Sequence, residues 1–283
     1  MQLSTLTNLC SKRFGDQKAI KWICEAGFDA IDYSMFDITS ENAMLNRSDY
    51  VSYAKELRVL VEAYGCRFNQ AHAPFPSHKP NDEDYNKVIV PYIQKSIEVA
   101  GILGAEIVVV HPTHFINHDK EAILEFYRSL QPYCKDYGVK VALENMFGRD
   151  KKRDYIVENV CSNPNQLCEF ADELDSRYFT VCLDIGHCGL VGQDPCEFIR
   201  ELGHDRLKAL HVHDNNFKED MHIWPYSSLQ DWDGITAALK EINYSGVFTF
   251  EADHSMEHYP EELMLDACVF MEKIGRHLIS KIV

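Results

Sequence analysis

The sequence has little positive charge, no long apolar run and no secretion signal, and each of these absences excludes a class of protein. Its 28 Lys and Arg residues are outnumbered by 44 Asp and Glu residues, which gives a formal net charge of −16, whereas proteins that bind nucleic acids usually carry a basic face. No stretch approaches the ~18 apolar residues of a membrane span, and the first residues, MQLSTLTNLC, lack the basic and apolar regions of a signal peptide. We therefore expect a cytoplasmic protein with no membrane or nucleic-acid partner.

Two families of short motif are also absent. None of the ten cysteines forms a C-x-x-C pair, so neither a thiolate zinc site nor a thioredoxin-type redox pair is predicted, and we expect free thiols. There is no G-x-G-x-x-G and no P-loop, which argues against a doubly wound sheet that binds a nucleotide. What is present is an ordinary globular composition, 46% apolar and 25% charged over 283 residues, enough for one sizeable core.

Short runs rich in Val, Ile, Phe and Ala recur eight times and alternate with stretches of helical period. The predicted strands are LSTLTN near residue 5, AIDYSMF near 33, CRFNQAH near 69, EIVVVH near 108, VKVALEN near 142, FTVCLD near 182, LKALHVH near 210 and GVFTFE near 248. The clearest predicted helices are 48–65, which ends at Gly65, 162–174, capped by Ser162 or Asn163, and 231–246, which closes near Gly246. Eight βα units in a chain of this length predict a (β/α)8 TIM barrel, which typically has about 250 residues, and we expect one domain over 1–283.

Side chains that can bind metal end six consecutive predicted strands. They are His72, His111, Glu144, Asp184 with His187 close behind, His211 and Glu251. In a (β/α)8 barrel these strand ends meet at one rim, where buried carboxylates and imidazoles need partners or a cation. A single histidine at the end of a strand is more often structural, but six consecutive strands that end in possible ligands favour a shared divalent-metal site.

Other residues are expected near the same rim. Strand alternation puts His213 on the same face as His211, and the long loop 215–228 carries Asp220 and His222 back over the rim. The stretch GRDKKRD at 148–154 is most simply a solvated loop, although Arg149 or Arg153 there could hold a phosphate group of a substrate. His114 and His254 are expected to line the pocket without binding metal.

Several of these segments together resemble the xylose isomerase-like barrel superfamily, which includes sugar-phosphate isomerases and epimerases and the endonuclease-IV family (AP endonuclease family 2). The resemblance is carried by HAPF at 72–75, VVVHP at 108–112, ALENM at 142–146, LDIGH at 183–187, LHVHD at 210–214, DMHIWP at 220–225, DWDGI at 231–235 and FTFEAD at 248–253. The loop after His222 reads IWPYSS where relatives commonly have a Pro-Gly-x-Gly turn, so the sequence leaves the position of Asp220 and His222 open.

The resemblance implies a divalent-metal-dependent isomerase or epimerase that acts on a sugar or sugar phosphate by enediolate proton transfer; a related dehydratase fits the same scheme. It implies one metal ion held by Glu144, Asp184, His211 and Glu251, with Glu144 and Glu251 also transferring protons. His187, His213 and Arg149 are the expected substrate-binding residues. Zn or Mn is the expected ion, and Mg or Co stays open.

The alternative is an endonuclease-IV-like zinc phosphodiesterase acting on abasic DNA. In that family the resemblance implies additional ligands at His72, His111, His187, Asp220 and His222, all of which are present. The acidity of the chain argues against DNA as the substrate. A barrel that binds metal and ligand without turnover is a third interpretation. The sequence does not name the sugar, fix the number of ions or decide whether the chain forms a homo-oligomer.

Overall fold

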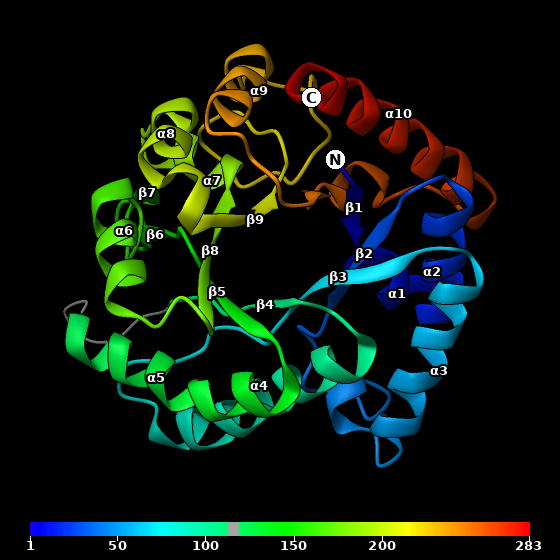
Figure 1. Ribbon diagram of the computed structural model, residues 1–283, viewed down its shortest axis with the longest axis horizontal. Helices are drawn as coiled ribbons and strands as arrows, with labels where there is room; N and C mark the ends of the chain where they lie inside the picture. The colour runs from blue at the N-terminus through cyan, green and yellow to red at the C-terminus, as the bar shows by residue number, and fades with distance from the viewer. Residues whose placement is uncertain (113–118) are drawn as a thin grey trace.

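A barrel of eight parallel strands, ringed by helices, forms the protein (Figure 1). The computed structural model describes residues 1–112 and 119–283, so the expectation for His114 lies outside the described residues. The strands follow the order β10-β1-β2-β3-β4-β5-β8-β9. A parallel bridge between Val212, just after β9, and Phe250 closes the ring. The predicted (β/α)8 fold is confirmed.

All eight predicted strands are present as strands of the barrel. They are β1 (Leu3–Leu6), β2 (Ala30–Ser34), β3 (Arg67–His72), β4 (Ile107–Val109), β5 (Lys140–Glu144), β8 (Phe179–Asp184), β9 (Leu207–His211) and β10 (Phe248–Phe250). Their apolar side chains on the outer face pack against the helices and form the main core.

The helices of the described chain lie outside the strands (Figure 1). They are α1 (Asn8–Phe14), α2 (Asp16–Glu25), α3 (Tyr50–Ala63), α4 (Glu83–Leu103), α5 (Lys120–Tyr137), α6 (Pro164–Glu173), α7 (Ile185–Leu190), α8 (Pro195–Arg206), α9 (Trp232–Glu241) and α10 (Met264–Ile282), with short 3-10 turns at Met44–Asn46, Asp253–Met256 and Glu261–Leu263. None of them is long and apolar enough to cross a membrane.

Helix ends follow the sequence signals in two of three cases. Asn163 caps α6 by accepting a hydrogen bond from the Gln166 backbone N–H, and α3 is followed by Gly65 at a φ of 76°. The predicted end of α9 near Gly246 was wrong. The helix stops at Glu241 because Asn243 adopts a positive φ and Tyr244 turns back into the core.

The interior of the barrel is apolar on one side and polar on the other. Strand alternation puts the residue two positions before each rim residue on the same inner face. On β4, β5, β8 and β9 these residues are apolar and pack together as Val109, Ala142, Cys182 and Ala209. On β3 and β10 they are Gln70 and Thr249, which are buried and joined by a hydrogen bond. Below the rim residues there is therefore a close-packed layer of side chains, which is apolar inside β4, β5, β8 and β9 and polar beside β2, β3 and β10.

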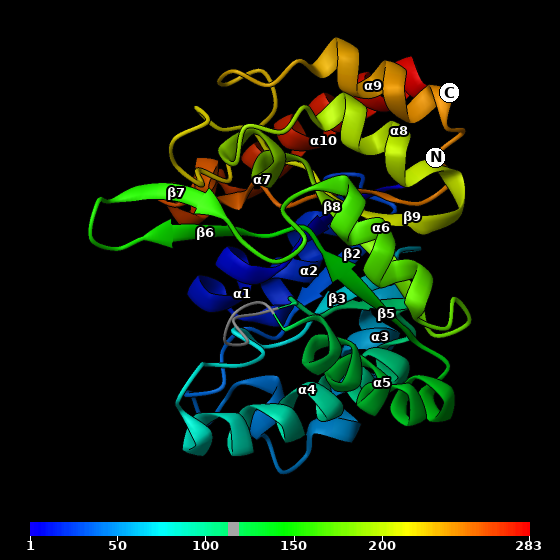
Figure 2. The same cartoon turned by 90° about the vertical axis from the view of Figure 1, so that its left-hand side faces the viewer.

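One antiparallel hairpin interrupts the βα alternation. Strands β6 (Phe147–Asp150) and β7 (Tyr155–Glu158) follow β5 and project from the barrel (Figure 2). The stretch 148–154 was predicted as a loop, and this was wrong because the residues before and after its turn at 151–154 pair as strands.

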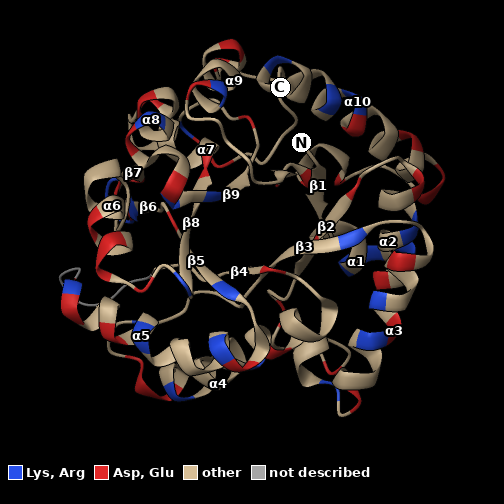
Figure 3. Ribbon diagram, viewed as in Figure 1, with Lys and Arg blue, Asp and Glu red and all other residues tan. Residues whose placement is uncertain are grey.

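On the outer helices, Lys and Arg are interspersed with Asp and Glu (Figure 3).

Candidate metal centre

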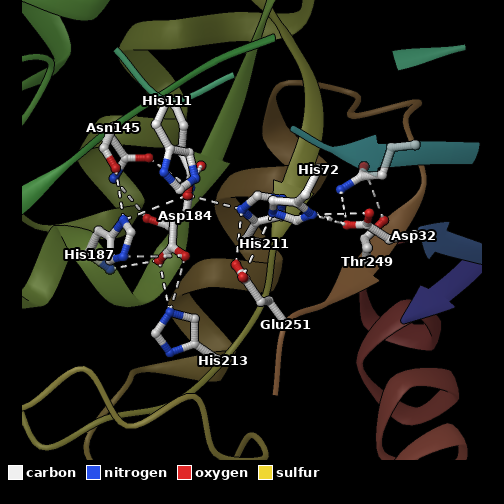
Figure 4. Close-up of polar contacts among 12 residues, drawn as sticks. Asp32, His72, His111, Asn145, Asp184, His187, His211, His213, Thr249 and Glu251 are labelled. Atoms are coloured by element: carbon white, nitrogen blue, oxygen red, sulfur yellow. Dashed lines mark hydrogen bonds and ion pairs between the residues drawn. The ribbon is translucent and has the colours of Figure 1, made fainter. Parts of the chain in front are cut away.

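Four side chains at the carboxyl ends of β5, β8, β9 and β10 lie close together inside the rim, and three of them, Asp184, His211 and Glu251, are labelled in Figure 4. The four are Glu144, Asp184, His211 and Glu251, and one ligand atom of each lies within 4.8 Å of the other three. Nδ1 of His211 lies 3.0 Å from Oε1 of Glu144 and 3.1 Å from Oε2 of Glu251. Three carboxylates and one imidazole in a nearly water-free site make a donor set suited to a divalent cation.

Asp184 is held in place by its neighbours on both sides. Its Oδ1 accepts a hydrogen bond from the His187 backbone N–H and so caps α7. The side chain of Asn145 pairs with the backbone of Asp184 in both directions, at 2.7 and 2.8 Å. His213 approaches from the other side, with Nε2 3.0 Å from Oδ1 of Asp184. The carboxylate therefore enters the site in one defined orientation.

A second group of donors lies beside the first. It consists of His187, His213, Asp220 and His222, whose ligand atoms also lie within 4.8 Å of one another. Asp220 Oδ2 is 2.9 Å from Nε2 of His222, and it lies 3.7 Å from Nε2 of His187. Burial alone would lower the pKa of both histidines, but neighbouring carboxylates raise that of His187 to about 10 and that of His222 to about 9.

Asp214 anchors the loop that carries two members of this second group. Its buried carboxylate accepts hydrogen bonds from the backbone N–H groups of Ser228 and Gln230 and from the indole N–H of Trp232. These bonds fix residues 215–228 against α9, although the loop lacks a Pro-Gly-x-Gly turn. The structure therefore brings Asp220 and His222 to the rim.

His72 and His111 complete the ring of donors on the side of β3 and β4. Together with Glu144 they form a third group within 4.8 Å, and Nε2 of His111 is 2.8 Å from Oε2 of Glu144. The ring of His72 stacks on that of His211, with centroids 4.3 Å apart. Glu144 is thus shared between the third group and the first.

The protonation of the two glutamates differs sharply in the absence of a cation. Burial, together with the charges of Glu144 and Asp184, raises the pKa of Glu251 well above its usual range. Burial also disfavours ionised Glu144, but His211 and His111 outweigh that effect and hold its pKa well below the usual range. The pair therefore carries one proton acceptor and one proton donor.

Ring nitrogens of several buried histidines face the donor groups, which is the arrangement expected of metal ligands. Nδ1 of His187 donates to the Asn145 carbonyl and Nδ1 of His222 to the Glu251 carbonyl, each at 2.9 Å. In each case the far nitrogen, Nε2, faces the donors of the second group. Metal-ligating histidines usually donate their other N–H to such an acceptor. Nε2 of His72 is buried without a hydrogen-bond partner, so the residues present fit a divalent cation.

A cavity of about 880 Å³ opens above these donors. Its floor includes Glu144, His187 and Glu251, and its walls are largely apolar and aromatic, formed by residues that include Phe36, Phe75 and Phe147. The cationic side chains that line it are Lys79, Arg149 and Lys151. The size is that of a small-molecule site.

Arg149 and His213 were both expected to bind substrate, but only Arg149 lines the cavity. Arg149, on β6, lines the cavity as expected, although its guanidinium also pairs with Asp154 at 2.8 Å. His213 does not line the cavity. It is fully buried behind Asp184 because Gly186 leaves room there for its ring, so the structure places His213 against Asp184 and not at the wall of the cavity. Arg153 is directed to Tyr155 and Asp150 instead of the cavity.

Sequence reasoning missed two residues of the site. Asp32, on β2, is fully buried, and its carboxylate lies 3.0 Å from Nδ1 of His72. Asn145 positions both Asp184 and His187. An aspartate inside the apolar run AIDYS was the signal for the first; the second carries no signal beyond its position after Glu144.

Curated relatives are similar to this chain over most or about half of its length. An uncharacterized protein of Methanocaldococcus jannaschii is 30% identical over 241 residues, 81% of this chain and 76% of its own. A D-psicose 3-epimerase of Enterocloster bolteae is 24% identical, over 79% of this chain and 74% of its own. A probable endonuclease 4 of Mesomycoplasma hyopneumoniae is 30% identical over a shorter region, 46% of this chain and 50% of its own.

Solved structures share the fold over the full chain. The IOLI protein, solved with a binding zinc atom, superposes with a TM-score of 0.78 at 19% identity and covers 100% of this chain and 99% of its own. A D-tagatose 3-epimerase-like protein gives 0.74 at 23% identity, over 100% of this chain and 98% of its own. The family model described as xylose isomerase-like TIM barrel matches residues 20–274. The chain therefore belongs to the xylose isomerase-like TIM barrel family.

Proposed function

We propose that this protein is a divalent-metal-dependent isomerase or epimerase of a sugar or sugar phosphate, with residues 1–283 acting as one domain. The observation that carries the proposal is the convergence of Glu144, Asp184, His211 and Glu251, of which Glu144 and Glu251 line a cavity of small-molecule size. A D-psicose 3-epimerase among the relatives, similar over most of both chains, supports the same class of reaction. A dehydratase acting on a similar polyol fits the same arrangement.

The four converging donors are the residues that would hold the metal ion. A divalent ion there would polarise a substrate carbonyl, acidify the neighbouring C–H bond and lower the pKa of Glu251. Zn and Mn suit a mixed set of carboxylates and imidazole, and Mg or Co also fits. The additional donors His72, His111, His187, Asp220 and His222 could hold further ions.

Proton transfer is assigned to the two glutamates. Glu144 and Glu251 come from β5 and from the end of β10, on different sides of the site, so one can remove a proton from a carbon while the other returns one on the opposite face. The opposite displacement of their pKa values equips one as acceptor and the other as donor. The catalytic residues of the proposal are therefore Glu144 and Glu251.

Binding of the substrate is assigned to the residues above the floor. His187 lines the cavity beside Glu144, and its ring is fixed by the Asn145 carbonyl, so it can orient a substrate hydroxyl. Arg149 lies on the hairpin at the mouth, where it can contact a phosphate group.

The test is exchange of substrate hydrogen with solvent. Metal-free protein is reloaded with Mn²⁺, Zn²⁺, Co²⁺ or Mg²⁺ and incubated with ketoses and ketose phosphates in deuterated water, and NMR follows deuterium at the carbon next to the carbonyl. The proposal expects exchange with at least one ion, and none in Glu144→Gln. Cleavage of abasic duplex DNA without any sugar turnover would contradict it.

The donors beyond the first four favour one second candidate, an endonuclease-IV-like zinc phosphodiesterase. Among the described residues there are four groups of possible ligands, three of which share members, and this is more than a single-metal isomerase needs; two-metal sites commonly serve phosphodiester hydrolysis. Against it stand the formal net charge of −16 and the few cationic side chains at the cavity, because DNA affinity depends on Lys and Arg contacts to phosphates.

A further inference from the structure

Asp32 is a buried carboxylate to which the proposed reaction assigns no role. It lies on β2 with 0% of its surface exposed, and in the part of the chain that the structure describes it neither lines the cavity nor pairs with an arginine or lysine. Its oxygens accept two hydrogen bonds from side chains, one from Nε2 of Gln70 at 2.8 Å and one involving Nδ1 of His72 at 3.1 Å. Burying a carboxylate in this way costs free energy of hydration unless hydrogen bonds from its partners compensate for it.

The amide of Gln70 is fixed in the orientation that donates to Asp32. Its carbonyl oxygen accepts from the hydroxyl of Thr249 and from the amide of Asn69, both at 3.4 Å. Asn69 in turn is held by the hydroxyl of Ser4 at 2.7 Å. Oδ2 of Asp32 accepts from Gln70, and Nδ1 of His72 lies 3.0 Å from that oxygen and 3.1 Å from Oδ1, so the carboxylate can accept the N–H of His72 as well.

The ring of His72 is consequently locked in both position and tautomer. With Nδ1 donating to Asp32, the lone pair of Nε2 is free, and that atom is buried without a hydrogen-bond partner. It lies 3.7 Å from Oε1 of Glu251, and the ring is stacked on His211. A carboxylate behind a histidine is a common device for orienting a ligand nitrogen toward a metal ion.

We propose that Asp32 is a positioning residue for His72: it fixes the imidazole so that Nε2 faces the donor group that His72 forms with His111 and Glu144. The inference rests on the proposed function only in taking the bound ions to be divalent cations. Asp32, His72 and His211 also have ligand atoms within 4.8 Å of one another, but the proposal gives Asp32 the Nδ1–H of His72 as its partner, so that it acts by holding the Nε2 lone pair of His72 toward the cluster.

Asparagine at position 32 is a sharp probe because it has nearly the same shape but one acceptor instead of two. Both Gln70 and His72 present an N–H to Asp32, so Asp32→Asn leaves one N–H facing another donor. The N–H of an asparagine at this position would favour the wrong tautomer of His72, with a proton on Nε2. We expect affinity at this site to fall about 10- to 100-fold.

The experiment counts Zn²⁺ ions retained by the full chain during titration with a chelator. The proposal expects Asp32→Asn and His72→Ala to lose the same single ion, the double variant to be no worse than His72→Ala, and the four-donor site to keep its ion. The matched control is Asp29→Asn, the same change in a carboxylate that pairs with Arg276; it should retain every ion. Unchanged Zn²⁺ affinity in a folded Asp32→Asn would overturn the inference.

Two outcomes separate this inference from the proposed function. If the wild-type chain holds an ion at the four-donor site and none on His72, the inference fails and the proposed function stands. If neither site takes an ion, both fail. Should Asp32→Asn not fold, ¹⁵N NMR of the metal-free wild type at a pH above the His72 pKa decides: protonated Nδ1 supports the proposal, and protonated Nε2 overturns it.

Discussion

Adding one methyl group at Gly186 should weaken metal binding without touching any of the four converging donors directly. A Cβ at this position would come within 2.6 Å of three ring atoms of His213, where ordinary contact begins near 3.4 Å. The ring would have to recede by about 1 Å or more, yet it is fully buried, stacked on His222 and hydrogen-bonded to Asp184. Overpacking of this kind typically costs about 1–3 kcal/mol.

We therefore expect Gly186→Ala to unfold at a lower temperature, by about 2 °C per kcal/mol in a chain of this size, and to bind divalent metal more weakly because Asp184 is displaced. Differential scanning fluorimetry and metal titration measure the two effects. Gly189→Ala is the matched control on the same helix, since its methyl would meet Phe217, which is partly exposed and can move away. The double variant Gly186→Ala/His213→Ala should recover stability relative to Gly186→Ala. Wild-type stability and metal affinity in Gly186→Ala would refute the reasoning.

Three further predictions follow from the same geometry. Glu251→Gln should reduce solvent exchange of substrate hydrogen about 10²- to 10⁴-fold. It should leave the metal-free protein as stable as the wild type, because burial and the neighbouring carboxylates raise the pKa of Glu251 and favour its neutral form there; a drop in unfolding temperature without loss of exchange would contradict this. In the metal-free protein the pKa values of His222 and His187, raised from 6.5 to about 9 and about 10, lie above their unfolded values, so their contribution to stability is complete below pH 6.5 and is lost as pH rises toward 10. Thermal unfolding across that range checks it, and Asp220→Asn should flatten the profile. Removal of metal by a chelator should lower the unfolding temperature, since an ion at 100 times its dissociation constant stabilises the folded state by about 2.7 kcal/mol; equal melting with and without the ion would show that none binds the native state.

The sequence was sufficient for the barrel and for most of its rim, and the reason is periodicity. Strands ending in Glu144, Asp184 and His211 are short apolar runs between amphipathic helices, and the (β/α)8 fold brings such ends together. Once the count of units is right, the convergence of donors follows from topology alone.

What the sequence could not supply depends on contacts between distant segments. His213 was expected to face the substrate because alternation gives only the face of a strand; its burial behind Asp184 depends on the absence of a side chain at Gly186. The β6–β7 hairpin was missed because GRDKKRD has the composition of a solvated loop. Asp32 was overlooked because its partners, Gln70 and His72, lie on the neighbouring strand.

Anomalous diffraction from crystals grown with Mn²⁺ or Zn²⁺ tests the central claim most directly. The account predicts an ion at the floor of the cavity, about 2.0–2.2 Å from carboxylate oxygens of Glu144, Asp184 and Glu251 and from a ring nitrogen of His211. Crystals that contain the metal at comparable concentration but show no anomalous peak between these four residues would contradict it.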